Sequence, residues 1–415
     1  MRTTILHVAA LCTASALSTT QPVVRLFSLS DLHVDYAANL DTVKNLKRPP
    51  GDGHLALIIA GDVTANRETL REALTSLRDT FDDVFYVPGN HEAWVTASDR
   101  ADGIGDSVAK LRACEDVAAS CGCTTQPTTL EDASGRSVIV APLRAWYHAS
   151  HDREPAVLPG ADDTKGFARR WADFRKCRWP PQLLGRGGTE AVAHGLGAGD
   201  EALSAYFAST NTIERDVIPL VTFSHFSPRH ECVPEKRFLL EPCLAKVSGS
   251  DDLGRLVASL RPDVHVFGHT HIPIDLDLDG TYHVQWPLGS PHEQSRQCAR
   301  AKALGPLELY STATGVRRLG EEGAPERTAW GAYYSEKPRT PSVTEPAPWV
   351  ASYRKRRARK VKARVPNHAG YDSEVAALSR HDSQVAALSR RSTVERLEGW
   401  TDDGYVSGYD GGYVN

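Results

Sequence analysis

The chain has 415 residues, of which 41% are hydrophobic and 24% are charged, and its formal net charge at pH 7 is −4. This apolar fraction is too high for a wholly disordered chain, and the charge is too nearly balanced for a protein whose whole surface binds nucleic acid. Eight cysteines in so long a chain exclude a small scaffold that depends on disulfides, and no apolar run reaches the about 20 residues of a membrane-spanning helix.

The N-terminal segment, residues 1–20, combines one arginine, a mostly apolar stretch and no acidic residue. Its small residues Ala14-Ser15-Ala16 resemble the cleavage site of a secretory signal peptide. A transit peptide for an organelle has the same lack of acidic residues, and an uncleaved terminus of a cytoplasmic protein is a third interpretation. The sequence therefore leaves secretory, organellar and cytoplasmic localisation open.

Short apolar segments alternate with segments of helical pattern from Val23 onward. Six of the apolar segments are rich in Val, Ile and Phe and are bounded by Gly, Pro, Asp or Ser, which is typical of buried strands. These segments are Val23–Leu29, Leu55–Ala60, Val84–Val87, Val138–Ala141, Val217–Phe223 and Val264–Phe267.

Two segments between these strands repeat apolar residues at the spacing of one helix face. The first runs from Asn66, a suitable N-cap, to Thr80, and the second follows Asp251 and stops before Pro262. The apolar positions are Leu70, Ala73, Leu74 and Leu77 in the first helix and Leu253, Leu256, Val257 and Leu260 in the second. The alternation of strands and helices predicts an α/β fold with crossover connections.

Two regions depart from this regular pattern. Residues 150–215 are irregular and rich in Gly, Ala and Trp, and we interpret them as an insertion, such as a lid or cap over a site. From residue 326 the chain becomes rich in proline and then in low-complexity sequence, which predicts a linker and a largely disordered tail over 326–415.

The predicted tail contains a basic run and an internal repeat. Basic residues dominate from Arg354 to Arg364, and a ten-residue unit occurs twice, at Asp372–His381 and Asp382–Arg391. The basic run could bind an acidic partner or serve as a nuclear signal, and a solvated charged segment is the simpler interpretation. The body of the chain gives no strong signal for nucleic-acid binding.

Five of the six predicted strands end in residues that commonly bind metals. These segments are Ser30-Asp31-Leu32-His33, Gly61-Asp62, Gly89-Asn90-His91-Glu92, Ser224-His225-Phe226 and Gly268-His269-Thr270-His271. Ligands bind beyond the carboxyl ends of strands in open α/β sheets, so we expect the five segments to meet at one edge, with glycines letting the turns carry side chains inward. Carboxylates, an amide and imidazoles together suit Mn, Fe or Zn, and the set is large enough for two divalent ions if one carboxylate bridges them.

The order of these motifs, D-x-H, GD, GNH[DE], H and GHxH, resembles that of the calcineurin-like metallophosphoesterase superfamily. The resemblance extends from about Val24 to Ser290, and the stretches Thr222–Pro228 and Pro234–Arg237 are most similar to an uncharacterised eukaryotic branch of it. It implies a fold of class α/β (α+β), with two packed mixed β-sheets flanked by helices in four layers. We assign this domain to residues 22–325, with the insertion inside it.

The resemblance also implies a site for two divalent transition-metal ions. Asp31, His33, Asp62 and His271 would bind one ion, and Asp62, Asn90, His225 and His269 would bind the other, so that Asp62 bridges them. His91 would be catalytic, as the acid or electrostatic partner of the leaving-group oxygen.

Two further residues are candidates because of their chemistry and position. Glu92 follows the GNH motif directly and could orient a metal ligand. Arg229 follows His225 by four residues and could bind the substrate phosphate with its planar guanidinium, although arginine is abundant throughout this chain.

These residues predict a dinuclear metal-dependent phosphoesterase that hydrolyses a phosphate ester by attack of a hydroxide bridging the two ions. The alternative is a non-catalytic binding module on the same fold, which we would expect to lack some of the ligands. The segment after Asp62, with Ala65, matches neither the GDxxDRG pattern of protein Ser/Thr phosphatases nor the GDxxY pattern of purple acid phosphatases. Phosphomonoesterase and phosphodiesterase activity both remain open.

Overall fold

The computed structural model describes residues 23–157, 167, 169–184, 189–198, 206–207 and 217–364 of the chain. The predicted leader, the internal repeat, the rest of the predicted tail after residue 364 and parts of the predicted insertion lie outside these residues. Among the helices that the structure describes, none combines the length and the apolar character needed to cross a membrane.

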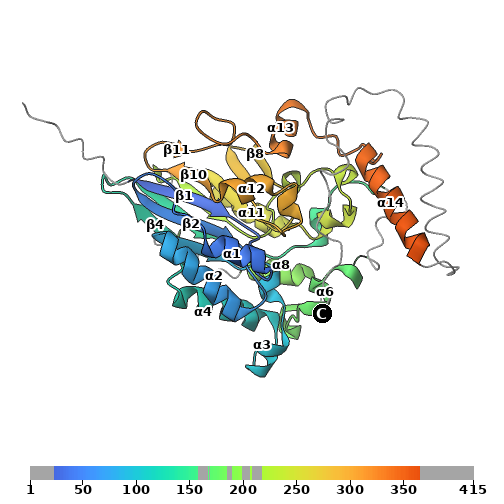
Figure 1. Ribbon diagram of the computed structural model, residues 1–415, viewed down its shortest axis with the longest axis horizontal. Coiled ribbons are helices and arrows are strands. Elements are labelled where there is room, and N and C mark those ends of the chain that lie inside the picture. The colour runs from blue at the N-terminus through green and yellow to red at the C-terminus, as the bar shows by residue number, and fades with distance from the viewer. Residues whose placement is uncertain are drawn as a thin grey trace, which may run out of the picture.

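The first sheet has the strand order β11-β10-β1-β2-β3 (Figure 1). Its strands are β1 (Val24–Leu29), β2 (His54–Ala60), β3 (Asp83–Val87), β10 (Leu307–Ser311) and β11 (Gly315–Val316). Strands β1, β2 and β3 are parallel, whereas β10 pairs antiparallel with β1. Parallel neighbours need crossover connections, and helices α1 (Ala37–Lys44) and α2 (Arg67–Thr80) lie in the two connections.

The second sheet has the strand order β4-β5-β6-β7-β9-β8. Its strands are β4 (Thr128–Glu131), β5 (Ser137–Pro142), β6 (Leu220–Phe223), β7 (Val264–Phe267), β8 (Ile274–Leu278) and β9 (Thr281–Gln285). The four central strands are parallel, and β4 and β8 form antiparallel pairs at the two edges. Both sheets are therefore mixed.

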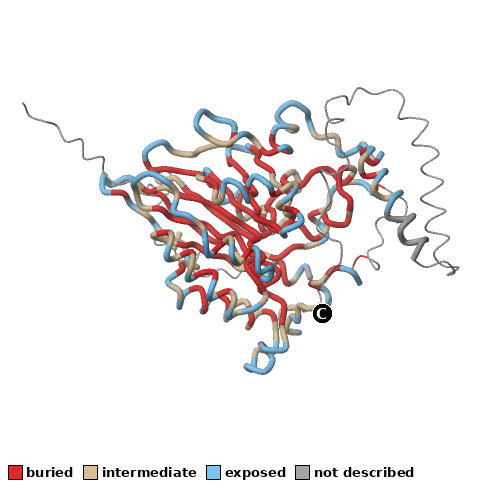
Figure 2. The backbone as a smooth tube through the Cα atoms, in the orientation of Figure 1, coloured by how far each residue is buried: buried red, intermediate tan, exposed pale blue. Residues whose placement is uncertain are grey.

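The two sheets pack face to face, and side chains alternate between their faces as the pleat requires. Val138 and Val140 of β5 join the hydrophobic cluster of the first sheet, whereas Ile139 and Ala141 join the cluster that contains helix α11 (Asp251–Leu260). Buried segments run through the middle of the molecule in Figure 2. This arrangement confirms the prediction of two packed mixed sheets flanked by helices.

The two helices predicted from apolar spacing are α2 and α11. Asn66 caps α2 by accepting the Thr69 amide at 2.9 Å, and all four predicted apolar positions of α2 are buried. Ser250, the residue before Asp251, caps α11, and Arg261 follows the last helical residue in the left-handed conformation, just before Pro262.

The other described α-helices are shorter or less regular in sequence. They are α3 (Ala97–Ala101), α4 (Ser107–Ser120), α6 (Asp173–Lys176), α7 (Pro181–Leu184), α8 (Thr189–Ala198), α12 (Ala299–Leu304), α13 (Ala329–Glu336) and α14 (Pro348–Arg364). Helices α6, α7 and α8 belong to the predicted insertion.

The structure describes two helices after residue 325, within the segment predicted as linker and tail. Helix α13 buries Trp330 and α14 buries Val350, both in the hydrophobic cluster of the second sheet. Arg339, in the connection between these helices, donates to Glu154 at 2.8 Å. The prolines mark helix boundaries here, since Pro348 is the first residue of α14, a position where its missing N–H costs nothing.

Candidate metal centre

The five predicted ligand segments follow the carboxyl ends of β1, β2, β3, β6 and β7, and the loops of the two sheets meet. The His269 amide donates to Asp31 Oδ1 at 2.8 Å, which joins the loop after β7 to the loop after β1. His225 Nδ1 lies 2.9 Å from the Ala60 carbonyl oxygen, which joins the loop after β6 to the end of β2. The two sheets thus bring together the ligands predicted for one edge.

The backbone of these loops is held in a conformation that side chains rarely adopt. Among the described residues, seven non-glycine residues have positive φ, and five of them are predicted ligands. These five are Asp31, His33, Asp62, His269 and His271, with φ of 53°, 43°, 52°, 77° and 53°. Each such residue costs about 1–2 kcal/mol, a strain that persists only where the surrounding structure enforces it and that is common at functional sites.

Two glycines allow close approach at this edge. A Cβ atom on Gly89 would lie 2.2 Å from Asp62 Oδ1, and one on Gly61 would lie 2.5 Å from His225 Nδ1. Any side chain at either position would displace a predicted ligand, which gives these glycines a steric role at the site.

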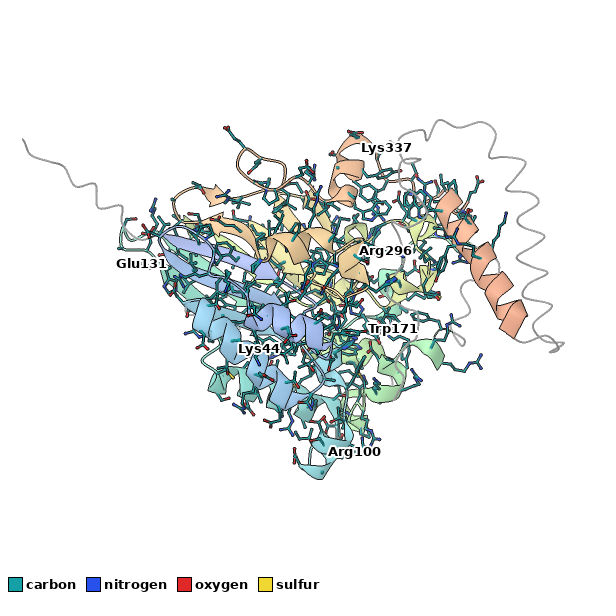
Figure 3. All side chains as sticks on the ribbon, viewed as in Figure 1. Lys44, Arg100, Glu131, Trp171, Arg296 and Lys337 are labelled. Carbon is teal, nitrogen blue, oxygen red and sulfur yellow. The ribbon has the colours of Figure 1, made fainter. Side chains whose placement is uncertain are left out.

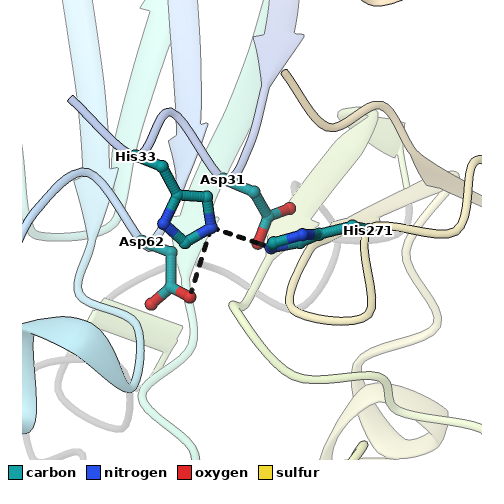
Figure 4. Close-up of side chains that lie close together, drawn as sticks. All are labelled: Asp31, His33, Asp62 and His271. Carbon is teal, nitrogen blue, oxygen red and sulfur yellow. Dashed lines mark hydrogen bonds and ion pairs between the residues drawn. The ribbon is translucent and has the colours of Figure 1, made fainter. Parts of the chain in front are cut away.

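We call Asp31, His33, Asp62 and His271 the first ligand group (Figure 4). His33 Nε2 and His271 Nε2 lie 2.8 Å apart, and His33 Nε2 lies 3.9 Å from Asp62 Oδ2. Asp31 Oδ1 lies 3.5 Å from His271 Nε2. One potential ligand atom from each residue falls within 4.8 Å of the others.

The second ligand group consists of Asp62, Asn90, His225 and His269. Asn90 Oδ1 lies 2.9 Å from His225 Nε2 and 2.8 Å from His269 Nδ1, and these two nitrogens are 3.2 Å apart. Asp62 Oδ1 lies 3.4 Å from His225 Nε2, whereas its Oδ2 faces the first group. The two oxygens of one carboxylate therefore serve the two groups.

The hydrogen bonds on the far sides of these ligands show that the second group fits a cation. The contact with the Ala60 carbonyl requires a proton on His225 Nδ1, and Asn90 Nδ2 donates to Asp173 Oδ1 at 3.0 Å. When the His225 ring is neutral, its Nε2 therefore carries a lone pair that faces a lone pair of Asn90 Oδ1. Ligands that bind one ion at about 2.1 Å and at right angles lie about 3 Å apart, which is the spacing seen here.

Charge in this buried site shifts two pKa values strongly. Burial raises the pKa of Asp62, but the neighbouring histidines, His225 first, outweigh it and hold that pKa well below its usual range. Burial lowers the pKa of His225, but Asp62 and Asp31 raise it to about 9. The acidic ligands thus attract positive charge to the second group, and a divalent ion competes with a proton for that place.

Glu92 is bound entirely through backbone amides. It is buried and accepts the amides of Gly89 at 2.6 Å, Asp62 at 3.1 Å, Val63 at 2.7 Å and Thr64 at 3.1 Å. Burial and the charge of Asp62 raise its pKa to about 7. Glu92 therefore fixes the loop that carries Asp62 rather than touching a ligand side chain.

Glu293 supports His271 and was not predicted from the sequence. It is 2% exposed and accepts from His271 Nδ1 at 2.9 Å and from the Ser290 amide at 2.8 Å. Burial raises the pKa of Glu293, but His271 and the hydrogen bonds lower it to about 2. A carboxylate behind an imidazole in this way fixes the ring orientation of metal-binding histidines.

His91 lies at the edge of both groups. Its Nε2 is 3.8 Å from Asp62 Oδ2, and its ring stacks on Trp94 with centroids 3.7 Å apart. Its buried Nδ1 has no hydrogen-bond partner among the described residues. Burial holds the pKa of His91 well below its usual range, so the ring is neutral at neutral pH.

Arg229 is placed in an ion-pair cluster rather than among the ligands. Its Nε and Nη2 donate to Glu231 at 3.2 and 2.9 Å, and its Nη1 donates to Asp279 at 2.7 Å. These two carboxylates occupy the guanidinium fork that was predicted to bind phosphate. A role of Arg229 in substrate binding stays a prediction.

Comparison with known protein families and structures gives consistent matches. A family model described as calcineurin-like phosphoesterase matches residues 24–273. The acyl-carrier-protein phosphodiesterase PptH of Mycobacterium tuberculosis is 39% identical over 74 residues, which are 18% of this chain and only 22% of that protein.

Solved structures match about two thirds of this chain at lower sequence identity. The crystal structure of phosphopantetheinyl hydrolase PptH from Mycobacterium tuberculosis has a TM-score of 0.50 at 23% identity, and the match covers 66% of this chain and 93% of that one. The crystal structure of TT1561 from Thermus thermophilus has a TM-score of 0.35 at 15% identity, over 64% and 89% of the two chains. The likeness to PptH supports the same fold.

Proposed function

The chain belongs to the calcineurin-like phosphoesterase family, and from this premise we propose that it hydrolyses phosphate esters with two bound divalent metal ions. The observation that carries the proposal is the second ligand group, in which Asn90 Oδ1, His225 Nε2 and His269 Nδ1 converge within 3.2 Å of one another. These lone-pair atoms lie beside a carboxylate that the first ligand group shares, so the donor set suits two adjacent cations.

Each part of the site has a role in this proposal. The first and second ligand groups would each hold one ion of Mn, Fe or Zn, and Asp62 would contribute to both. When bound, such a pair of ions neutralises phosphoryl charge and lowers the pKa of water. The buried carboxylates and the strained loops fix where that positive charge lies before substrate arrives.

His91 acts on the leaving-group oxygen as a hydrogen-bond donor. Its ring is neutral because burial lowers its pKa, and one ring nitrogen then carries a proton that it can share without giving it up. Stacking on Trp94 holds the ring in place. We therefore favour the electrostatic role of His91 over full proton donation.

The alternative, a binding module without catalysis, is supported less well. Every predicted ligand is present, and second contacts orient His225, His271 and Asn90. Retaining these buried carboxylates and strained loops without an ion would destabilise the fold for no gain.

The test measures whether purified, Mn²⁺-loaded protein hydrolyses aryl phosphate monoesters and diesters. Because the curated relative is an acyl-carrier-protein phosphodiesterase, the acyl-carrier-protein phosphodiester belongs in the same panel. We expect turnover of at least one substrate class and a loss of at least about 100-fold in Asn90→Ala, since that change removes a ligand. The exposed Asn45 provides the matched control, and Asn45→Ala should leave turnover unchanged.

Two results would contradict this proposal. Folded protein that binds Mn²⁺ and hydrolyses no ester in the panel would favour the binding module. Activity that survives in Asn90→Ala would contradict the assignment of the second ligand group.

A further inference from the structure

Asp173 forms a buried hydrogen-bond cluster behind the second ligand group. It lies in α6, within the irregular segment that the sequence predicted as an insertion, and it is 3% exposed. Its Oδ1 accepts from Asn90 Nδ2 at 3.0 Å and from Trp94 Nε1 at 2.7 Å, and its Oδ2 accepts from Trp171 Nε1 at 2.8 Å. Three N–H groups from two parts of the chain thus share one carboxylate.

The backbone holds this carboxylate in place against the loop after β3. The Val95 amide donates to the Lys176 carbonyl at 3.1 Å, and the Ser107 amide donates to the Arg178 carbonyl at 2.7 Å. Trp171, labelled in Figure 3, packs its ring against His269 at a centroid distance of 5.9 Å. The segment that carries Asp173 is therefore a fixed part of the site.

Asp173 decides which end of the Asn90 amide faces the metal position. An amide has one oxygen and one NH₂ group, and only the NH₂ group can donate to a carboxylate. With Nδ2 bound to Asp173, Oδ1 points to His225 Nε2 and His269 Nδ1. The reversed amide would place its oxygen against the carboxylate and its N–H groups where a cation would sit.

The same carboxylate oxygen also anchors the ring that supports His91. Trp94 Nε1 donates to Asp173 Oδ1, and the Trp94 ring stacks on His91 at 3.7 Å between centroids. Asp173 therefore contacts a predicted ligand directly and the predicted catalytic histidine through one tryptophan.

We propose that Asp173 is a positioning residue that orients Asn90 for the metal ion of the second ligand group and, through Trp94, holds the ring of His91. The proposal rests on the function proposed above. It assigns the described part of the insertion a role within the active site rather than in a lid above it.

The experiment measures Mn²⁺ binding to metal-free protein by calorimetric titration, which needs no turnover. In Asp173→Ala, no side-chain acceptor faces Asn90 Nδ2, so the Asn90 amide loses its fixed orientation. We expect one of two Mn²⁺ equivalents to bind about 10–100-fold more weakly, the usual effect of losing an outer partner of a ligand. The other equivalent should keep its wild-type affinity.

Two reference variants identify which equivalent is lost. His269→Ala removes a ligand of the second group alone, and His271→Ala removes a ligand of the first group alone. The proposal requires the binding curve of Asp173→Ala to resemble that of His269→Ala. A wild-type curve, or one that resembles His271→Ala, would overturn it.

A rescue variant separates positioning from general damage to the fold. Trp171→Phe removes the donor to Oδ2, so that in the double variant Asp173→Asn/Trp171→Phe the carboxamide can turn its oxygen to Asn90 and its NH₂ group to the phenylalanine ring. We expect this double variant, which again offers an acceptor to Asn90, to bind the weakened equivalent more tightly than Asp173→Ala. Equal weakness in both would contradict the positioning role.

A second substitution guards against failure to fold. Asp173→Ser leaves room for water to satisfy the tryptophans, and it should show the same selective loss of one equivalent. Failure of the proposed function is distinguishable, because it appears as wild-type protein that binds no Mn²⁺ or hydrolyses nothing. Failure of the positioning role appears as normal wild-type binding that Asp173→Ser and Asp173→Ala leave intact.

Discussion

Single side chains at this site are held by hydrogen bonds on the side away from the metal position. The Ala60 carbonyl fixes His225, Glu293 fixes His271 and Asp173 fixes Asn90. Such partners orient a ligand and raise its basicity, so their removal weakens metal binding without removing a ligand.

Glu293→Gln tests this arrangement in the first ligand group. The amide keeps an acceptor for His271 Nδ1 but loses the negative charge, so we expect Mn²⁺ to bind that group about 10–100-fold more weakly. The matched control is Glu308→Gln, which changes a carboxylate that pairs with Arg25 at 2.9 Å on the first sheet. Calorimetric titration measures both, and equal affinities in the two variants would contradict the role of Glu293.

The sequence predicted the ligands but not the residues behind them. Asp31, Asp62 and His269 stand directly after strands in short, recognisable motifs. Glu293 and Asp173 belong to none of these motifs, and Asp173 lies in an irregular segment that only the fold brings to the loop after β3. Glu293 and Asp173 are distinguished by being acidic and buried. Their burial depends on tertiary structure, which the sequence does not show.

At the scale of elements, one buried ion pair joins helices α2, α3 and α4. Lys110 of α4 is fully buried, and its Nζ lies 2.6 Å from Asp99 Oδ1 and 2.9 Å from the Ala65 carbonyl oxygen. Arg67, the first residue of α2, donates to the same Asp99 oxygen at 2.9 Å. Through the Ala65 carbonyl, this pair contacts the segment that follows Asp62.

Asp99→Asn should destabilise the protein because it leaves Lys110 buried without its carboxylate. Removal of one partner of a buried pair costs about 3–5 kcal/mol, measured as the free energy of unfolding in urea. Asp102→Asn is the matched control, since that exposed partner of Arg67 should cost less than about 1 kcal/mol. Similar losses in the two variants would contradict the importance of the buried pair.

The same pair predicts the direction of pH dependence. Burial raises the pKa of Asp99, but its hydrogen bonds, chiefly to Lys110, lower it to about 2. A carboxyl with a lowered pKa stabilises the fold fully above the unfolded value of about 3.9. That contribution should be lost as pH falls toward 2, and Asp99→Asn should lack this part of the acid sensitivity in urea unfolding.

Long, strongly patterned elements were predicted from the sequence and short edge elements were not. Helix α2 and strands β2 and β7 match their predictions closely because their apolar residues recur at the spacing typical of a helix or a buried strand. Strand β8 contains Asp275 and Asp277, and its pairing with β9 stabilises it at the sheet edge. Strand β6 begins at Leu220 rather than at Val217, which is 75% exposed.

In the molecule as a whole, described residues after 325 pack against the domain that we assigned to residues 22–325. The prolines after residue 326 suggested a linker, yet Trp330 and Val350 pack in the cluster of the second sheet. Arg339 also donates to the carbonyls of Glu231 and Val233 at 3.0 and 2.8 Å. The composition of this segment gave no sign of these long-range contacts.

Truncation tests this boundary. Deleting residues 326–415 removes buried side chains that contribute about 1.5–3 kcal/mol each, so we expect a marked fall in the midpoint of thermal unfolding. Deleting only residues 365–415 keeps α13 and α14 and should have a much smaller effect. Equal midpoints for the two truncations would show that the helices do not stabilise the domain.

The central claim is that two ions share the Asp62 carboxylate. Anomalous X-ray scattering from crystals soaked in Mn²⁺ tests it most directly. The account predicts two peaks, one next to Asp62 Oδ2 among Asp31, His33 and His271, and one next to Asp62 Oδ1 among Asn90, His225 and His269. Crystals without a peak beside Asp62, or with a single peak that only one ligand group contacts, would contradict it.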